Sequence, residues 1–226
     1  MTFKQLFDSE TSTLTYILVD PSTKDAVIID PVLGQEERDL AELKAMGAHL
    51  SYIAETHVHA DHVTGARVLK DITRCQFIAG KGTGISCGDQ LLGDGESIRF
   101  GHETLTAIQT PGHTSGCTTY QWRDKLFTGD TLLIGGCGRT DFQQGDPGQL
   151  FDSLQKLLEY PDETLVYPAH DYNGFRVSSI GQEKLTNSRI KGRSRQNFID
   201  NMNGLELPNP AKIDIAVPAN MVCGMA

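Results

Sequence analysis

Long apolar runs, clustered basic residues and paired cysteine motifs are all scarce in this sequence of 226 residues. No apolar stretch approaches the roughly 20 residues that a membrane-spanning helix needs, so we expect no membrane insertion. Lys and Arg number 20 against 29 Asp and Glu, and the net charge of −9 argues against nucleic-acid binding, which needs clustered positive charge. Small-molecule chemistry fits this composition better.

The five cysteines form no C-x-x-C pair, and their odd number leaves at least one thiol free. This usage is typical of a cytoplasmic protein with unpaired, reduced thiols and not of a disulfide scaffold. The N-terminal segment has neither the apolar core of a secretion signal nor the Arg-rich character of an organelle transit peptide. We therefore expect a cytoplasmic location.

Strand-like and helix-like segments alternate along the chain. The expected strands are 14–20, 26–30, 50–54, 104–109, 118–122, 125–127 and 164–167, and the expected helices are 36–46, 63–71 and 149–158. The first two strands flank a proline-led turn and form a hairpin, Gly47 caps the first helix, and Asp61 caps the second. This order predicts an α/β sandwich with mixed sheets and outer helices. The length fits a single domain.

Four potential metal ligands lie within six positions in the segment His57-Val58-His59-Ala60-Asp61-His62. The segment follows the apolar strand 50–54, which delivers it to a strand end. Nitrogen and carboxylate ligands at this density suit zinc or iron better than calcium or magnesium, which prefer oxygen ligands. The segment therefore predicts a metal site.

Three more candidate ligands each follow an expected strand: His113, Asp130 and His170. Each has a glycine or proline nearby, which lets the backbone turn sharply so that the side chain projects into a shared cleft. With seven donors, the residues by themselves favour a two-metal hydrolytic centre. In that centre one ion binds His57, His59 and His113, the other binds Asp61, His62 and His170, and Asp130 bridges them.

The pattern H-x-H-x-D-H followed by His, Asp and His closely resembles the metallo-β-lactamase superfamily. The match spans Leu14 to His170 and implies a four-layered αββα sandwich. It implies one domain over residues 1–226, with roughly 175–226 as a C-terminal elaboration and no fused rhodanese domain. Since the superfamily catalyses several reactions, the motif indicates the fold better than the activity.

Two longer segments indicate which of the superfamily's reactions this chain catalyses. Residues 139–144, Arg-Thr-Asp-Phe-Gln-Gln, and residues 167–175, Tyr-Pro-Ala-His-Asp-Tyr-Asn-Gly-Phe, closely resemble the persulfide dioxygenases of this superfamily. The tail Val-Pro-Ala-Asn-Met at 217–221 resembles them too. The resemblance implies oxidation of glutathione persulfide by O2 and water to sulfite and glutathione, with glutathione as the carrier part of the substrate. A separate sulfurtransferase partner and a homo-oligomeric state are compatible with it.

The same resemblance implies one iron(II) per chain, bound by His57, His113 and Asp130. Two histidines and one carboxylate leave three positions open for a sulfur substrate and O2, whereas zinc has no accessible redox change. The remaining donors, His59, Asp61, His62 and His170, would then support the ligands from outside the coordination sphere, where substitutions cost less than at a ligand.

Arg139 and Tyr172 are candidate substrate-binding residues. The guanidinium of Arg139 suits a glutathione carboxylate, although an ion pair with Asp141 explains it equally well. Tyr172 either donates its hydroxyl to the substrate or forms an aromatic wall. Cys137 is best explained as a small buried thiol, so we expect no catalytic nucleophile.

Two alternatives to the dioxygenase stay open. One is a glyoxalase II-like hydrolase of glutathione thioesters with a two-metal site, but the helical glutathione-binding domain of that family is absent after His170. The basic residues there, Lys191, Arg193 and Arg195, are best explained as a solvated face. The other is a metal-dependent sulfur-binding or sensing protein without turnover.

Overall fold

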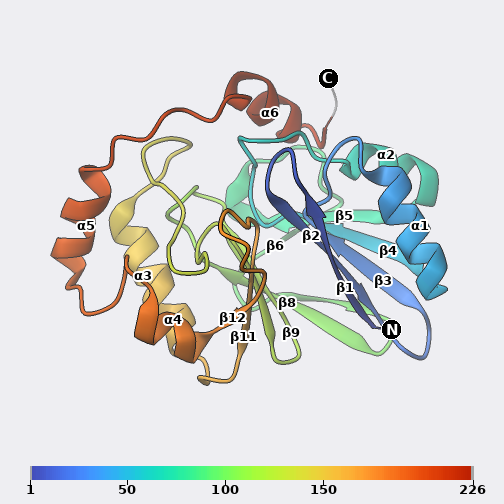
Figure 1. The fold of residues 1–226 in the computed structure, drawn as a ribbon. Coiled ribbons are helices and arrows are strands. Elements are labelled where there is room, and N and C mark those ends of the chain that lie inside the picture. Colours follow the sequence, from blue (N-terminus) through green and yellow to red (C-terminus); the bar gives the residue numbers. More distant parts are fainter. Residues whose placement is uncertain (1, 225–226) are drawn as a thin grey trace.

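Two six-stranded β-sheets face each other at the centre of the computed structural model, which describes residues 2–224 (Figure 1). The first sheet has the order β1-β2-β3-β4-β5-β6, with β1 Phe3–Asp8, β2 Thr13–Val19, β3 Asp25–Ile29, β4 His49–Ala54, β5 Gln76–Gly80 and β6 Gln90–Leu92. The second has the order β12-β11-β10-β9-β8-β7, with β7 Ser97–Phe100, β8 Glu103–Gln109, β9 Thr118–Trp122, β10 Lys125–Gly129, β11 Leu165–Pro168 and β12 Ser178–Ser179. Both sheets are mixed, because parallel pairs occur at β3–β4, β4–β5, β5–β6 and β10–β11.

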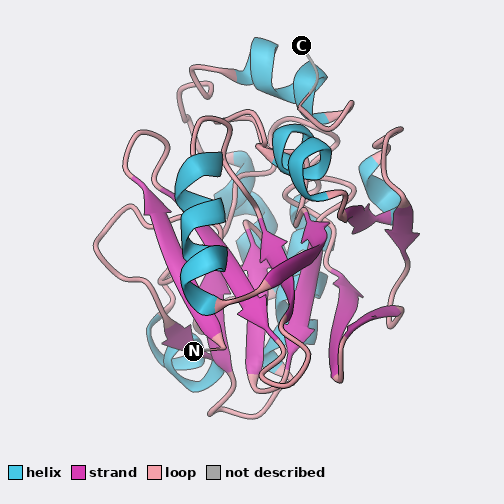
Figure 2. Ribbon diagram, turned by 90° about the vertical axis from the view of Figure 1, so that its right-hand side faces the viewer, coloured by secondary structure: helices cyan, strands magenta, loops and turns pink. Residues whose placement is uncertain are grey.

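Helices cover the outer face of each sheet (Figures 1 and 2). The α-helices are α1 Glu36–Met46, α2 Ala66–Thr73, α3 Pro147–Leu158, α4 Ile180–Thr186, α5 Arg195–Asn203 and α6 Ile213–Asn220, and a 3-10 helix spans Lys81–Thr83. Leu43 of α1 and Leu69 of α2 share one apolar cluster with the first sheet, and Leu154 of α3 and Phe198 of α5 share another with the second sheet. A third cluster fills the space between the sheets. The predicted αββα sandwich is confirmed.

β2 is buried throughout and mostly apolar because both of its faces are covered. Ile17 and Val19 pack in the cluster that α1 and α2 cover, whereas Tyr16 and Leu18 pack in the cluster between the sheets. A strand alternates its side chains between two faces, so a strand buried on both sides needs a continuous apolar run. β2 therefore contributes to two cores at once.

The expected hairpin and first helix agree with the structure. β2 and β3 pair antiparallel, and α1 ends at Met46 with Gly47 in the left-handed conformation. The second expected helix starts later than predicted, because α2 begins at Ala66 and its N-terminal flanking residue is Gly65. The prediction that Asp61 caps this helix is wrong, since its carboxylate lies instead beside His62.

Five strands were not expected from the sequence. β6 and β12 have three and two residues, too few for a periodic pattern. β1 lies at the edge of the first sheet and carries Lys4 and Gln5, so its alternation is weak. β5 has five residues and is buried over its last four, and β7 alternates over only four residues, so neither pattern is long enough to predict a strand.

The chain after α5 crosses the upper edge of the sandwich and places α6 over the loop that precedes α2 (Figure 1). A disulfide between Cys87 and Cys223 fastens the residues after α6 to the segment before β6. The expectation of unpaired thiols is therefore wrong for these two residues, because partners separated by 136 positions leave no local signature in the sequence. Cys75, Cys117 and Cys137 are free. Within residues 2–224, no helix has the length and apolar character to cross a bilayer.

Candidate metal centre

The seven predicted donors meet at one edge of the sandwich, where β4, β8, β10 and β11 end. His57, His59, Asp61 and His62 follow β4, and the donors after the other three strands are His113, Asp130 and His170. His170 Nε2 lies 3.6 Å from Asp130 Oδ1 and 3.8 Å from Asp61 Oδ2. All seven side chains therefore share one region, although they come from distant parts of the chain.

Glycines next to two of the donors allow the loops to approach closely. Gly112 has φ +136°, and a Cβ on it would lie 2.2 Å from the backbone nitrogen of Leu150 in α3. Gly129, before Asp130, has φ +54°, and its Cβ would lie 2.8 Å from the Thr56 side chain. Only glycine combines these conformations with such contacts. The sequence-based argument that glycine turns these loops is thus supported at both positions.

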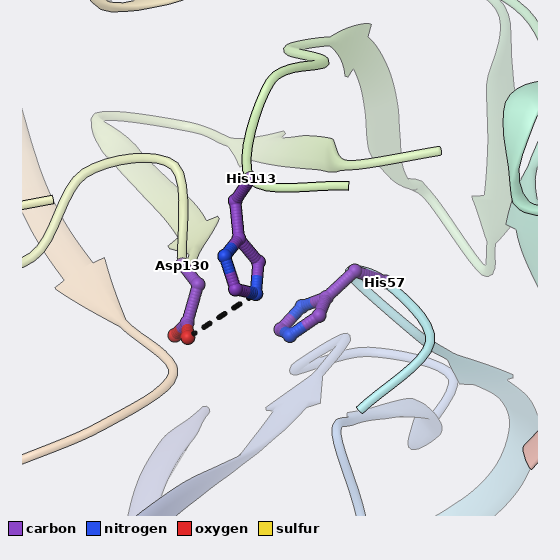
Figure 3. Close-up of side chains that lie close together, drawn as sticks. All are labelled: His57, His113 and Asp130. Carbon is purple, nitrogen blue, oxygen red and sulfur yellow. Dashed lines mark ion pairs between the residues drawn. The ribbon is translucent and has the colours of Figure 1, made fainter. Parts of the chain in front are cut away.

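His57, His113 and Asp130 form one close group of donors (Figure 3). One donor atom from each lies within 4.8 Å of the others, and His113 Nε2 is 3.6 Å from Asp130 Oδ2. Ligands of one transition-metal ion lie about 2.1 Å from it, so two adjacent ligands are roughly 3 Å apart. Small side-chain movements would place all three atoms on a single ion.

Hydrogen bonds orient the rings of His57 and His113 so that Nε2 of each faces the shared metal position. Thr56 Oγ1 donates to Asp30 Oδ2 at 2.8 Å, which leaves it as the acceptor for Nδ1–H of His57 at 2.9 Å. His113 Nδ1 lies 2.7 Å from the carbonyl oxygen of Arg139, which can only accept. With Nδ1 protonated in both rings, each Nε2 carries the lone pair that a metal ion needs.

The second group of donors consists of His59, Asp61 and His62, whose donor atoms also lie within 4.8 Å of one another. His59 is fully buried, and its Nε2 lies 3.3 Å from Asp30 Oδ1 and 3.4 Å from Glu55 Oε2. His62 Nδ1 lies 3.0 Å from Asp61 Oδ2. The structure thus places His59 between two acids and groups it with Asp61 and His62.

The surroundings lower the pKa values of His57 and Asp61, whereas Asp30 and Glu55 overcome the effect of burial and raise the pKa of His59. Burial, followed by the neighbouring His59 and His113 rings, lowers the pKa of His57 well below its ordinary value. Burial tends to raise the pKa of Asp61, but the hydrogen bond from His62 and the charges of His170 and His62 outweigh it and lower that pKa. A neutral imidazole and an ionised carboxylate are the forms that bind metal ions.

Buried polar atoms without hydrogen-bond partners indicate that the donor set fits a transition-metal ion. Buried polar atoms without a hydrogen-bond partner are uncommon in folded proteins. Within residues 2–224, Asp130 Oδ1, His62 Nε2 and His170 Nδ1 are buried atoms of this kind. Asp130 Oδ1 lies 3.6 Å from His170 Nε2, and an unpaired buried carboxylate oxygen beside an imidazole nitrogen is explained by a cation that binds between them.

A cleft of about 700 Å³ opens onto this centre. His57, His113, Asp130 and His170 contribute to its floor, and the segment 207–212, between α5 and α6, forms one wall. Apolar lining from Leu133, Phe142 and Leu207 accompanies these polar groups. The cleft is large enough for a small peptide-like molecule with one end at the donors.

Arg139 lines the cleft, but its guanidinium is already engaged by protein groups. It forms a two-pronged ion pair with Asp141, at 2.6 and 2.5 Å, and donates to the carbonyl oxygens of Pro208 and Leu207. Its guanidinium carbon lies 4.8 Å from the centre of the Phe142 ring. The ion pair with Asp141 that the sequence suggested is therefore present, and Arg139 also connects the metal-bearing side of the cleft with the wall at 207–212.

Tyr172 and Cys137 also line the cleft. The Tyr172 ring stacks on His170 with centres 5.3 Å apart, and most of the side chain is exposed. Cys137 Sγ lies 4.0 Å from Met202 Sδ, and burial raises the pKa of its thiol to about 12. Cys137 is only partly buried, so the predicted small buried thiol is confirmed only in part.

Sequence reasoning missed three polar residues that hold the donor loops. Thr56 and Asp30 orient His57, and the buried side chain of Asn220 binds the backbone of residues 59–64. Thr56 precedes the histidine motif directly, and Asp30 ends a strand, so both had a positional signal. Asn220 lies in the tail that resembles the persulfide dioxygenases, but its separation of 161 positions from His59 hid the contact between them.

Comparisons with known proteins give the same assignment along the whole chain. The profile of the metallo-beta-lactamase superfamily matches residues 9–170. The chain is 46% identical to the mouse mitochondrial persulfide dioxygenase ETHE1 and 45% identical to the human one, over 98% of this chain and 88% of each relative. The crystal structure of ETHE1 from Myxococcus xanthus superposes with a TM-score of 0.98 at 47% identity and covers 100% of both chains.

Proposed function

Because the chain belongs to the metallo-beta-lactamase superfamily and, within it, to the persulfide dioxygenases, we propose that it oxidises glutathione persulfide at a single iron(II) ion. The reaction consumes one O2 and one water and releases sulfite and glutathione. His57, His113 and Asp130 are the proposed ligands. His59, Asp61, His62 and His170 are proposed to support them by hydrogen bonds and charge.

One observation carries the single-ion proposal: the way in which the donors are grouped. A two-metal hydrolase would place His57, His59 and His113 on one ion. Here the close groups are His57 with His113 and Asp130, His59 with Asp61 and His62, and His59 with Asp30 and Glu55, although the rings of His57 and His59 also lie 4.0 Å apart. His59 Nε2 lies beside two buried carboxylates, an arrangement that supports a structural role for this ring.

The contacts suggest separate roles for the metal ion, for the groups that orient its ligands and for the lining of the cleft. A bound iron(II) ion supplies the electrons and the open coordination positions that a reaction with O2 needs. Thr56 and the Arg139 carbonyl keep the two imidazoles turned toward the ion. The apolar lining excludes water from the sulfur end of the substrate, and the open end of the cleft accommodates the glutathionyl part.

Arg139 and Tyr172 remain the proposed contacts of the glutathionyl part. Since the guanidinium of Arg139 is paired with Asp141, its role includes holding the wall at 207–212 over the substrate. Tyr172 stacks on His170 at the cleft and offers a ring face and a hydroxyl. Both residues would then affect substrate affinity more than metal retention.

A second candidate function is hydrolysis of a glutathione thioester at two metal ions. The observation that favours it is the second donor group, in which His59, Asp61 and His62 lie close enough for another ion. Water activated between two ions would then attack the thioester. This candidate requires His59 to leave its contacts with Asp30 and Glu55 or to bind through Nδ1.

Metal quantification combined with oxygen uptake separates the two candidates. Protein purified without oxygen is expected to contain one iron per chain, to consume O2 when glutathione persulfide is added, and to release sulfite. Two zinc ions per chain together with hydrolysis of a glutathione thioester would contradict the proposal. Iron-loaded protein that binds the persulfide without O2 uptake would instead indicate a sulfur sensor.

The remaining proposals concern the context of the enzyme. We propose a single domain over residues 1–226 in which 175–226 elaborate the second sheet and the edge of the cleft. A cytoplasmic location, a homo-oligomeric state and a separate sulfurtransferase that supplies the persulfide are proposals of the same kind. Localisation of the tagged chain, its mass in solution and a coupled assay with a sulfurtransferase test them separately.

A further inference from the structure

The buried side chain of Asn220 binds the loop that carries four of the metal-site donors. Its Nδ2 donates to the carbonyl oxygens of His59 at 2.9 Å and His62 at 2.8 Å. Its Oδ1 accepts from the backbone N–H of Thr64 at 2.9 Å. The amide thus uses both of its donors and its acceptor on one loop, and Asn220 is only 3% exposed.

A disulfide holds the segment that presents this side chain. Cys223, three positions after Asn220, is bonded to Cys87 in the segment before β6. The non-covalent links of this segment are hydrogen bonds from Ser86 N–H at 3.2 Å and Ser86 Oγ at 3.4 Å to the carbonyl oxygen of Met221, and the packing of Val217, Met221 and Cys223 in the first apolar cluster. The Cys87–Cys223 bond is therefore the strongest link between the tail and the body of the fold.

The tail also lies against the loop through its backbone. A Cβ on Gly224 would come within 2.5 Å of the carbonyl oxygen of Thr64. The segment 206–212, which leads into α6, is largely exposed and packs less tightly than the tail itself. Loss of the disulfide would leave the three hydrogen bonds of Asn220 to depend on these non-covalent links and on α6.

We propose that Asn220 is a positioning residue for the metal-binding loop, and that the Cys87–Cys223 bond determines how firmly Asn220 holds it. Reduction by two small thiols breaks this sulfur–sulfur bond, forms one disulfide between the two reductant molecules, and leaves one proton on each cysteine thiol. The loop at 59–64 then loosens because its carbonyl oxygens lose their buried partner. The mechanism needs no contact between the reductant and the metal site.

The proposal rests on the proposed function only in naming the loop as metal-binding, so its main test is independent of catalysis. Hydrogen exchange is measured by mass spectrometry on the full chain, with and without metal, in peptides that cover residues 59–65. Treatment with dithiothreitol is expected to speed exchange at Thr64 roughly tenfold, the effect of losing one buried hydrogen bond. The same treatment should change Asn220→Ala very little, because this variant already lacks the bonds.

Two matched variants separate positioning from general destabilisation. Asn187→Ala removes another buried asparagine, whose Nδ2 donates to the carbonyl oxygen of Gly136, and should leave exchange at Thr64 unchanged. Cys87→Ser with Cys223→Ser should reproduce the reduced state without a reductant. In both this pair and Asn220→Ala, the visible absorption spectrum of the Co(II)-loaded chain should shift, whereas in Asn187→Ala it should not.

Several results would overturn the proposal. Alkylation and peptide mapping could find Cys87 and Cys223 as free thiols in the protein purified without reductant. Exchange at Thr64 could stay unchanged after complete reduction, or reduction could speed it equally in Asn220→Ala. Failure of the dioxygenase assay alone would contradict the proposed function and leave this proposal standing.

Discussion

His113 donates its Nδ1 proton to the carbonyl oxygen of Arg139 across 2.7 Å, so Nε2 of the same ring faces Asp130. The backbone of the loop after β10 therefore selects the tautomer of a proposed ligand that follows β8. Side-chain substitutions at Arg139 keep this carbonyl. The guanidinium and the carbonyl of one residue thus serve two different purposes, one in the cleft wall and one at the metal centre.

Replacement of Asp130 tests the proposed carboxylate ligand. Asp130→Ala should lower iron affinity more than a hundredfold and abolish oxygen uptake, because the variant leaves only two ligands on the ion. Inductively coupled plasma mass spectrometry and an oxygen electrode provide the two measurements. Asp61→Ala is the matched control and should retain most of the iron. Equal loss in both variants would favour the two-metal centre.

Replacement of Thr56 tests the orientation of His57. Thr56→Val keeps the shape of the side chain but removes the hydroxyl between His57 Nδ1 and Asp30, so iron affinity should fall roughly 10- to 100-fold. Competition with a chelator measures the affinity. Thr110→Val, which removes a buried hydroxyl that contacts Thr119, should leave iron affinity within about threefold of the wild type. An unchanged iron affinity in Thr56→Val would show that the hydrogen bonds from Asp30 through Thr56 to His57 do not orient this ligand.

The close approach of the His113 loop to α3 should make Gly112 sensitive to substitution. Gly112→Ala should lower the free energy of unfolding by about 3 kcal/mol, since the new methyl group overlaps the backbone of Leu150. Gly135 also has a positive φ, but a Cβ there would meet no atom within 4 Å. Gly135→Ala should therefore lower the free energy of unfolding by only about 1 kcal/mol. Urea denaturation measures both values, and equal costs would show that backbone strain alone is responsible.

Asp39 in α1 should produce a measurable pH dependence of stability. Burial raises the pKa of its carboxyl to about 6, against the opposing effect of Arg38. The folded state therefore binds a proton that the unfolded state releases near pH 4, and stability falls as the pH rises from about 4 to about 6. The stability of the wild type relative to Asp39→Asn should drop by roughly 2 kcal/mol over this range. A difference that is flat with pH would refute the assignment.

The sequence by itself predicted much of the fold and the seven donors. The mostly apolar run of β2 and the Gly47 cap of α1 are local signals. Each involves only a few neighbouring residues, so the sequence predicts it correctly. Donors after strand ends are similarly visible, because strand, glycine and ligand lie next to one another in the sequence. The short or weakly patterned strands β1, β5, β6, β7 and β12 were missed for the opposite reason.

Only the tertiary structure decided which donors belong together. The spacing in residues 57–62 gives four similar ligands, whereas the fold places His57 with His113 and Asp130 and places His59 between Asp30 and Glu55. The link from Cys87 to Cys223 and the contact of Asn220 with the histidine loop were equally invisible. These relationships join residues that are far apart in the chain, and their distances depend on how two sheets and six helices pack, which no local pattern encodes.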